Sequence, residues 1–435
     1  MATKINAYRA TIFHIHREPL GENDHRAYDF FEDGLLVTDH AHVLYAGDYS
    51  ELKHTLPLGC TIHDRTGMII MPGLIDTHVH YPQTDIIASH GKQLMDWLET
   101  YTFPCEKQFE DAGHSRQTAV FFIQELLKNG TTTAMVLGTV HAVSVQALFE
   151  KADDYTMRLV AGKVMMDRLA PHYLRDTAQS SYDESKHLIE HWHHKNRLTY
   201  AVTPRFALTS SEEQLDAAGA LIREFNDVRL HTHLAENTKE VDLIAKAFPW
   251  STGYLDVYNH FGLVCDRSVF AHCIYLSDTE FKLMKEKAAS VSLCPTSNLF
   301  LGSGLFDLGK IMTYEIKTGL GSDVGGGTSF SMFKTMAEAY KVCQLKGVTL
   351  SPVQSFYYAS LGAAKTLGLD QVIGNFEPGK EADFIVINPD QIPLLKRRIS
   401  MAQRPEEILF ALMILGDDRM IYETYVNGVK IPPLT

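Results

Sequence analysis

The alternation of apolar runs with amphipathic stretches is the feature that most constrains how this 435-residue chain can fold. Eight short apolar runs, each typical of a buried strand, lie between residues 68 and 322. These runs are 68–77, 131–137, 158–166, 198–204, 228–233, 269–276, 289–294 and 315–322. Helical stretches separate them, chiefly 116–128, 144–152, 181–193, 211–225, 240–247 and 278–287. Ser211 and Asp278 are candidate capping residues at the start of two of these helices.

Eight strands alternating with helices predict an α/β protein, a (β/α)8 TIM-like barrel, over residues 67–378. A doubly wound open sheet is the alternative architecture, but no Gly-x-Gly-x-x-Gly motif follows an early strand. In a barrel of this kind the active site lies where the carboxyl ends of the strands meet. Chemically active side chains are therefore expected at strand ends.

The two ends of the chain lack the helical spacing and favour short strands. Residues 7–15 alternate loosely between apolar and polar, and Asn427-Gly428 suits the type I′ turn of a hairpin near the other end. We therefore expect the two ends, 1–66 and 379–435, to pair into one small β-sandwich domain beside the barrel.

Composition and charge exclude several functional classes. No apolar run approaches the roughly 18 residues of a membrane-spanning helix, and the start lacks the apolar region of a signal peptide. The six cysteines show no Cys-x-x-Cys spacing, so a reduced, cytoplasmic protein is the simpler interpretation. The net charge of -13 argues against a nucleic-acid partner. We expect a small-molecule substrate and no membrane partner.

The segment PGLIDTHVH at 72–80 closes the first apolar run with two histidines. Residues i and i+2 of a strand face the same side, so His78 and His80 are expected to aim at one point. Neutral imidazole is a common ligand of zinc and other transition metals. A His-x-His pair also arises by chance, and two ordinary strand-end histidines are the alternative.

Three later strand ends carry further metal-binding or catalytic groups. The fifth strand leads into HTHLAE at 231–236, the sixth carries His272, and the eighth is followed by Asp323. Because barrel strand ends converge on one mouth, these groups are expected to meet there with His78 and His80. Their joint placement predicts a metal site. His231 is expected to point away from His233 and to be a packed histidine or one that supports a metal ligand.

The chain resembles the amidohydrolase superfamily and, within it, the branch of purine deaminases that act on guanine. The wider resemblance rests on 72–80, on the later strand-end groups and on PGKEAD at 378–383. The narrower one rests on HYPQ at 80–83, WL at 97–98, TFP at 102–104, TPRF at 203–206, HLAEN at 233–237 and CPTSN at 294–298. It covers nearly the whole chain and implies the same barrel with a flanking β-sandwich.

The resemblance implies a metal site with one zinc ion per chain. Its ligands would be His78, His80, His233 and Asp323, with His272 beside the reacting water. Arg205 stands at the fourth strand end, where binuclear relatives carry a carbamylated lysine, so one metal is favoured over two. Iron and manganese remain alternatives to zinc.

The resemblance also implies a reaction, the hydrolysis of guanine by water to xanthine and ammonia. Glu236, three residues after His233, suits the acid that protonates the ring nitrogen next to the attacked carbon. Asp323 suits the group that takes a proton from water and passes it to the departing ammonia. His272 would hold the attacking water in position.

Four side chains are candidates for substrate binding. Arg205 is a two-pronged donor suited to the O6 oxygen of guanine, and Gln83 offers a donor and an acceptor to the ring edge. Phe206 can stack on the ring, and Trp97 is expected as a wall of the pocket. A structural salt bridge for Arg205 and plain core packing for Phe206 are the alternatives.

Parts of the sequence are also compatible with other functions. Chlorohydrolases, cytosine deaminase and adenosine-type deaminases share the metal set, but Arg205 with Gln83 favours an oxo-purine. The other zinc deaminase fold needs Pro-Cys-x-x-Cys, and Pro104-Cys105 is followed by no second cysteine. A non-catalytic scaffold is a different class, against which the intact metal positions argue. The family resemblance also favours a homodimer.

Overall fold

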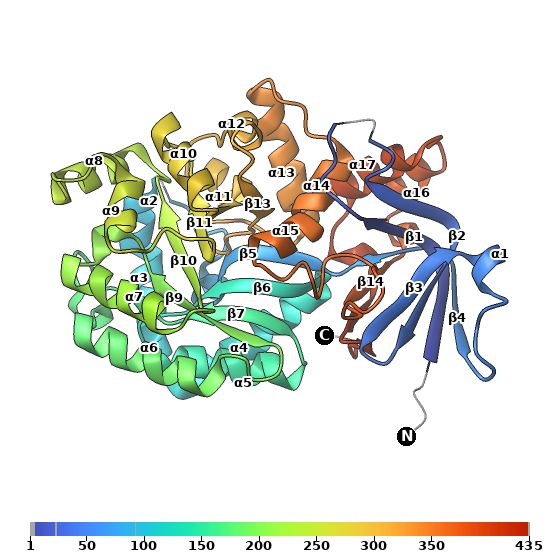
Figure 1. Ribbon diagram of the computed structural model, residues 1–435, viewed down its shortest axis with the longest axis horizontal. Coiled ribbons are helices and arrows are strands. Elements are labelled where there is room, and N and C mark those ends of the chain that lie inside the picture. Colours follow the sequence, from blue (N-terminus) through green and yellow to red (C-terminus); the bar gives the residue numbers. More distant parts are fainter. Residues whose placement is uncertain (1–4, 22–23, 92, 434–435) are drawn as a thin grey trace.

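The computed structural model describes residues 5–21, 24–91 and 93–433. Residues 1–4, at the start where we expected no signal peptide, lie outside these ranges. The chain forms a barrel surrounded by helices and, beside it, a smaller β-rich part that contains both the first and the last strands (Figure 1).

Eight parallel strands form the barrel and confirm the predicted α/β architecture. Their order is β5–β6–β7–β9–β10–β11–β12–β13, which follows the sequence. The strands are β5 (Leu74–His80), β6 (Thr131–Leu137), β7 (Arg158–Gly162), β9 (Leu198–Pro204), β10 (Arg229–Leu234), β11 (Ser268–His272), β12 (Ser290–Leu293) and β13 (Lys317–Leu320), and the short β8 (Val164–Met165) also pairs with β9. The barrel is nearly closed, because the Asp323 amide donates to the His78 carbonyl at 2.9 Å.

The first predicted strand, 68–77, is wrong in its boundaries. The apolar run is divided at Gly73: β4 (Thr61–Pro72) lies in the second sheet and only β5 belongs to the barrel. A Cβ atom at Gly73 would come within 2.1 Å of the Thr132 hydroxyl oxygen, so only glycine fits this crossing. Because both sides of the division are apolar and buried, the hydrophobic pattern gave no sign of it.

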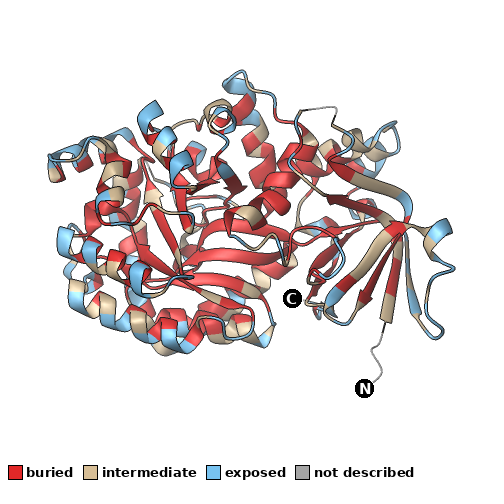
Figure 2. Ribbon diagram, viewed as in Figure 1, coloured by how far each residue is buried: buried red, intermediate tan, exposed pale blue. Residues whose placement is uncertain are grey.

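Helices cover the outside of the barrel, with buried inner faces and exposed outer faces (Figure 2). The predicted helices are present as α4 (Ala112–Lys128), α5 (Ala142–Asp154), α6 (Ala178–Trp192), α7 (Glu212–Glu224), α8 (Thr238–Ala247) and α10 (Asp278–Glu286). The Ser211 side chain caps α7 as expected. The cap of α10 is Ser277, not Asp278, and Glu280 completes a capping box with it.

The remaining helices are short or lie near the end of the chain. They are α1 (Tyr49–Leu52), α2 (Leu94–Trp97), α3 (Phe103–Lys107), α9 (Tyr254–His260), α11 (Pro295–Phe300), α12 (Leu308–Thr313), α13 (Met332–Leu345), α14 (Pro352–Tyr358), α15 (Leu361–Thr366), α16 (Pro393–Ile399) and α17 (Pro405–Leu415). No helix in the described ranges has both the length and the apolar content needed to cross a bilayer.

Both chain ends contribute to one seven-stranded mixed sheet, which confirms the expected β-rich part. Its order is β16–β15–β14–β4–β1–β2–β3, so the strands follow one continuous hydrogen-bonded path. They are β1 (Ile5–Ile15), β2 (Tyr28–Asp39), β3 (His42–Asp48), β4, β14 (Phe384–Ile387), β15 (Ile421–Val426) and β16 (Val429–Lys430). Asn427 and Gly428 both have positive φ, 51° and 74°, as a type I′ hairpin turn requires.

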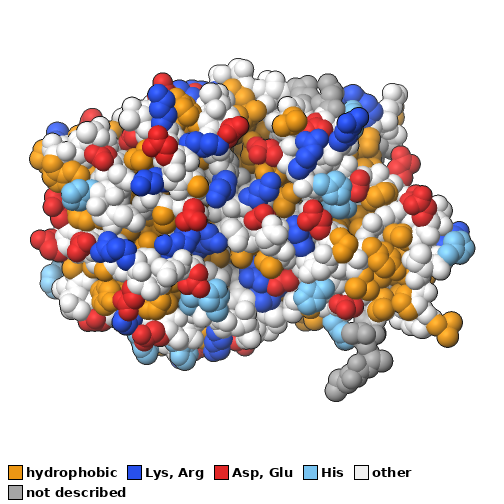
Figure 3. Space-filling view, viewed as in Figure 1, with side chains coloured by type: hydrophobic (Ala, Val, Ile, Leu, Met, Phe, Trp, Pro, Cys, Tyr) orange, Lys and Arg blue, Asp and Glu red, His pale blue; other side chains and the backbone are white. Residues whose placement is uncertain are grey.

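The division into 1–66 with 379–435 and 67–378 stays a prediction, and β4 continues in the mixed sheet as far as Pro72. On the face shown in Figure 3, acidic and basic side chains are interspersed rather than gathered by sign.

Candidate active site

The predicted metal-binding residues meet at the carboxyl ends of the barrel strands. His78 and His80 are among the last three residues of β5, His233 lies near the end of β10, and His272 ends β11. Asp323 follows β13 by three residues. Strands far apart in sequence therefore bring five side chains to one mouth, as the strand count predicted.

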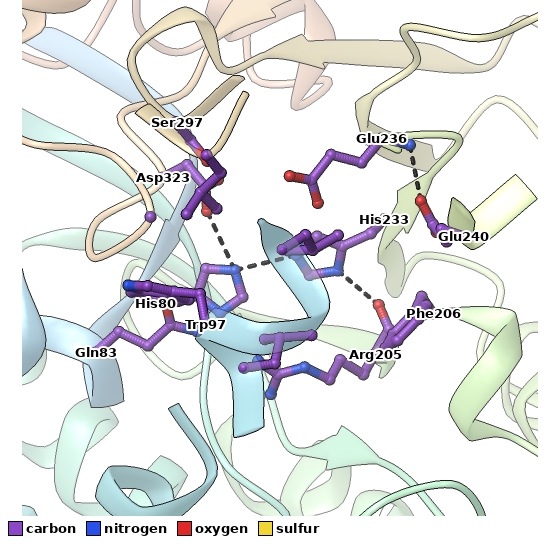
Figure 4. Close-up of a pocket in the computed structure, with 14 residues that line it drawn as sticks. His80, Gln83, Trp97, Arg205, Phe206, His233, Glu236, Glu240, Ser297 and Asp323 are labelled. Atoms are coloured by element: carbon purple, nitrogen blue, oxygen red, sulfur yellow. Dashed lines mark hydrogen bonds and ion pairs between the residues drawn. The ribbon is translucent and has the colours of Figure 1, made fainter. Parts of the chain in front are cut away.

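Short distances connect these side chains (Figure 4). Nε2 of His80 is 3.1 Å from Nε2 of His233 and 3.3 Å from Oδ1 of Asp323. Nε2 of His78 is 3.2 Å from the same carboxylate oxygen. One ligand atom from each of His78, His233, His272 and Asp323 lies within 4.8 Å of the others. The cluster thus offers imidazole nitrogens and a carboxylate around a common point.

The chemistry of this group fits a divalent metal ion. Nε2 of His272 is buried and makes no hydrogen bond within the described chain, a costly state for a polar atom. Burial lowers the pKa of His80 to about 3, so its ring stays neutral, as a metal ligand must be. Burial alone would raise the pKa of Asp323, but His78 and His80 hold it well below its usual value.

Hydrogen bonds to the second nitrogen of each ring set its orientation. Nδ1 of His233 lies 2.6 Å from the Arg205 carbonyl oxygen, and Nδ1 of His272 lies 2.9 Å from Oδ1 of Asn298. Because the Arg205 carbonyl can only accept, Nδ1 of His233 carries the proton and its Nε2 keeps its lone pair. Burial alone would lower the pKa of His272, but Glu236 and Asp323 raise it. The two hydrogen bonds aim the rings at the centre of the cluster.

The expectation that His231 points away from His233 is wrong. Residues i and i+2 of a strand share a face, and Nε2 of His231 lies 2.7 Å from Nδ1 of His78. His231 is fully buried, as expected for a packed histidine. The His231 ring therefore supports His78, one member of the metal group. The metal group comprises His78, His80, His233, His272 and Asp323.

Glu236 follows β10 and points into the same space as Asp323 (Figure 4). Oε2 lies 3.6 Å from Nε2 of His272, and the Ser303 hydroxyl donates to Oε1 at 2.8 Å. Burial raises the pKa of Glu236 to about 7. A carboxyl group with that pKa can hold or release a proton near neutral pH, as an acid–base catalyst must.

All four predicted substrate-binding residues line one pocket, together with His80, His233 and Asp323 of the metal group. Its polar lining comprises His80, Gln83, Arg205, His233, Glu236, Glu240, Ser297 and Asp323, and its apolar lining includes Leu94, Trp97, Leu98, Phe206 and Leu301. Trp97 is buried, and its indole N–H donates to the Ser89 carbonyl at 3.2 Å. That bond agrees with the expected role of Trp97 as a wall.

Sequence reasoning missed several residues of the site. Glu106 is buried, and both its carboxylate oxygens lie 2.8 Å from Nη1 of Arg205. Ser303 and Asn298 support Glu236 and His272 from a loop and from α11. The one available signal for Glu106 was its place as an acidic residue two positions after the TFP motif at 102–104.

The chain belongs to the amidohydrolase family, whose sequence pattern matches residues 69–431. Among curated proteins it is 51% identical over 402 residues to the guanine deaminase of Escherichia coli (strain K12), and the match covers 92% of both chains. Among solved structures, E. coli guanine deaminase superposes with a TM-score of 0.96 at 48% identity, covering 98% of this chain and 99% of the other. Guanine deaminase from C. acetobutylicum, solved with guanine bound in the active site, gives 0.88 at 29% identity and covers 98% and 100%.

Proposed function

We propose that this protein hydrolyses guanine to xanthine and ammonia, as a guanine deaminase. The proposal is carried by one arrangement: His80, His233 and Asp323 of the metal group line a single pocket together with Glu236 and Arg205. Similarity to guanine deaminases along nearly the whole chain supports it.

The proposed metal is one zinc ion per chain, held by His78, His80, His233 and Asp323, with His272 beside it. Imidazole and carboxylate are donors that zinc accepts readily. When bound, zinc lowers the pKa of water towards neutrality, which makes a hydroxide nucleophile available at physiological pH.

Two side chains of the pocket, Glu236 and Asp323, carry out different proton transfers. As the water oxygen bonds to C2 of guanine, Glu236 donates a proton to the adjacent ring nitrogen. Asp323 takes the proton that the water loses and passes it to the amine, so the C–N bond breaks and neutral ammonia leaves. His272 orients the attacking oxygen. The second water proton leaves the new C2 hydroxyl as the carbonyl forms and returns to Glu236. Guanine and water thus give xanthine and ammonia, and both acids regain their starting state.

The proposed recognition of guanine uses the remaining polar lining. Arg205 donates to O6, Gln83 contacts the ring edge, and Phe206 stacks on the ring face against the wall that Trp97 provides. Other amino-heterocycles share the reactive group, so this recognition decides the substrate. We also propose a homodimer, on the family resemblance, and a cytoplasmic location, on the scattered cysteines. Light scattering after gel filtration measures the oligomeric state.

Ammonia release from guanine, adenine, cytosine, isoguanine and melamine-type triazines tests the function. We expect guanine to be the best substrate of the zinc-loaded protein by at least roughly tenfold, the effect of one well-placed hydrogen bond. Release of ammonia from none of these compounds, with metal present, would instead support a scaffold. A preference for another compound would keep the enzyme class and reject guanine.

A further inference from the structure

Arg205 forms a buried ion pair with Glu106, a residue to which the proposed reaction gives no role. Arg205 and Gln83 together form what we call the substrate-binding wall of the pocket. Glu106, on α3, has a fully buried side chain, and the Arg205 side chain is 3% exposed. Both Oε1 and Oε2 of Glu106 accept from the same nitrogen, Nη1 of Arg205, at 2.8 Å. Removing two charges from water is costly, and such a pair contributes little net stability by itself. A buried pair of this kind beside the pocket points to a role in positioning.

The same carboxylate also fixes the amide of Gln83. Nε2 of Gln83 donates to Oε1 of Glu106 at 3.4 Å, while the Gly325 amide donates to Oε1 of Gln83 at 3.2 Å. A flipped amide would place its NH2 against the Gly325 N–H and its oxygen against the carboxylate. Two independent contacts therefore decide the orientation. Gln83 then turns its remaining N–H towards the pocket as a donor.

Arg205 likewise keeps donors free for a ligand. Within the described residues, the guanidinium makes hydrogen bonds to the protein through Nη1 and lies over the Phe103 ring, with its Cζ 5.8 Å from the ring centroid. Gln83 and Arg205 both line the pocket. The negative charge of Glu106 balances the positive charge of Arg205, so the wall carries no net charge but still presents several N–H donors. Such a wall suits an uncharged ring whose edge carries a carbonyl oxygen or another acceptor.

We propose that Glu106 is a positioning residue that makes this wall select amino-heterocycles bearing a carbonyl. It holds the guanidinium of Arg205 in place and sets which end of the Gln83 amide faces the ligand. This inference rests on the proposed function and deepens it, because it assigns the choice of an oxo-purine to a residue that does not line the pocket.

The test compares guanine with 2-aminopurine, which carries its amine on the same carbon but has no carbonyl. Glu106→Gln keeps the shape of the side chain but removes the charge that holds Arg205. We expect kcat/KM for guanine to fall about tenfold or more, chiefly through KM, because a charge-assisted hydrogen bond is lost or misplaced. We expect kcat/KM for 2-aminopurine to fall less than about threefold, because this ring lacks the carbonyl oxygen that Arg205 binds. Glu110→Gln is the matched control, because it removes the same charge from an exposed residue four positions further along the chain.

A double-mutant cycle separates positioning from a general loss of structure. If Glu106 acts through Arg205, Glu106→Gln should cost much less for guanine in an Arg205→Lys background than in the wild type. Glu106→Asp keeps the charge and should recover part of the guanine activity. Metal content and the 2-aminopurine rate report on folding of each variant.

Two results would overturn this inference. One is an equal loss for both purines, or no loss for either, in Glu106→Gln. The other is strict additivity with Arg205→Lys. A wild-type protein that releases no ammonia from guanine would instead reject the proposed function itself, so the two failures are distinguishable.

Discussion

Arg205 connects the metal group to the substrate-binding wall. Its carbonyl oxygen holds Nδ1 of His233 at 2.6 Å, while its side chain is paired with Glu106. The backbone of this residue therefore orients a metal ligand, and its guanidinium faces the proposed position of the base. Substitutions here change the side chain and leave the carbonyl, so they test recognition without removing the support of His233.

Glu236→Gln should leave the fold and the metal content unchanged, because Glu236 lies outside the proposed ligand set. Turnover of guanine should fall by at least roughly 10²-fold, the usual contribution of general acid–base catalysis. Steady-state kinetics and elemental analysis of the purified variant measure the two quantities. Near-normal turnover would rule out Glu236 as the proton donor.

Arg205→Lys should reduce kcat/KM for guanine roughly 10- to 200-fold, since a charged hydrogen bond is worth about 1.5–3 kcal/mol. A lysine keeps the charge beside Glu106 but cannot reproduce the planar fork. Arg205→Ala is a less clear test, because it also leaves the Glu106 carboxylate buried without its partner, a change that destabilises by about 3–5 kcal/mol. Equal losses for guanine and 2-aminopurine would make Arg205 structural.

At the scale of elements, a buried charge network joins the barrel to the mixed sheet. Arg197, just before β9, donates from Nη2 to Glu381 at 2.6 Å and also to Asp383. Nε of Arg158, the first residue of β7, donates to Glu381 at 3.0 Å. The two acids belong to the turn that leads into β14, so this network fixes the sheet against the amino ends of two barrel strands.

Arg197→Met should lower the free energy of unfolding by about 3–5 kcal/mol, because it leaves carboxylates buried without their main partner. Urea denaturation followed by circular dichroism measures the loss. Arg419→Met is the matched control: the Arg419 side chain is 64% exposed in its pair with Asp417, and surface pairs contribute about 0–1 kcal/mol. Equal effects of the two substitutions would contradict a structural role for the buried network.

At the scale of the whole molecule, the metal group should influence both activity and stability. We expect about one divalent metal ion per chain, with activity abolished by chelation and restored by zinc. Chelation should also lower the thermal midpoint, because an ion that binds only the folded chain stabilises it. Elemental analysis and scanning calorimetry measure these effects. Two ions per chain would refute the mononuclear site, and full activity without metal would refute the mechanism.

Much of the fold was predictable because local pattern and local structure coincide. The predicted strands 131–137 and 198–204 match β6 and β9 at both ends, since turn residues and polar positions limit these apolar runs. The division at Gly73 was missed, because the apolar run continues through it, although Pro72-Gly73 is itself a turn signal. The cap of α10 was misplaced by one residue, since Ser277 and Asp278 are both good caps.

The sequence by itself determined the barrel, the pairing of the chain ends and the meeting of the strand-end histidines with Asp323. Periodicity and the convergence of parallel strand ends suffice for these features. Only the tertiary structure decided how each group is held. Glu106 reaches Arg205 from 99 residues away, and His231 supports His78 from 153 residues away. Such contacts depend on burial and on the exact approach of distant elements, which no local pattern encodes.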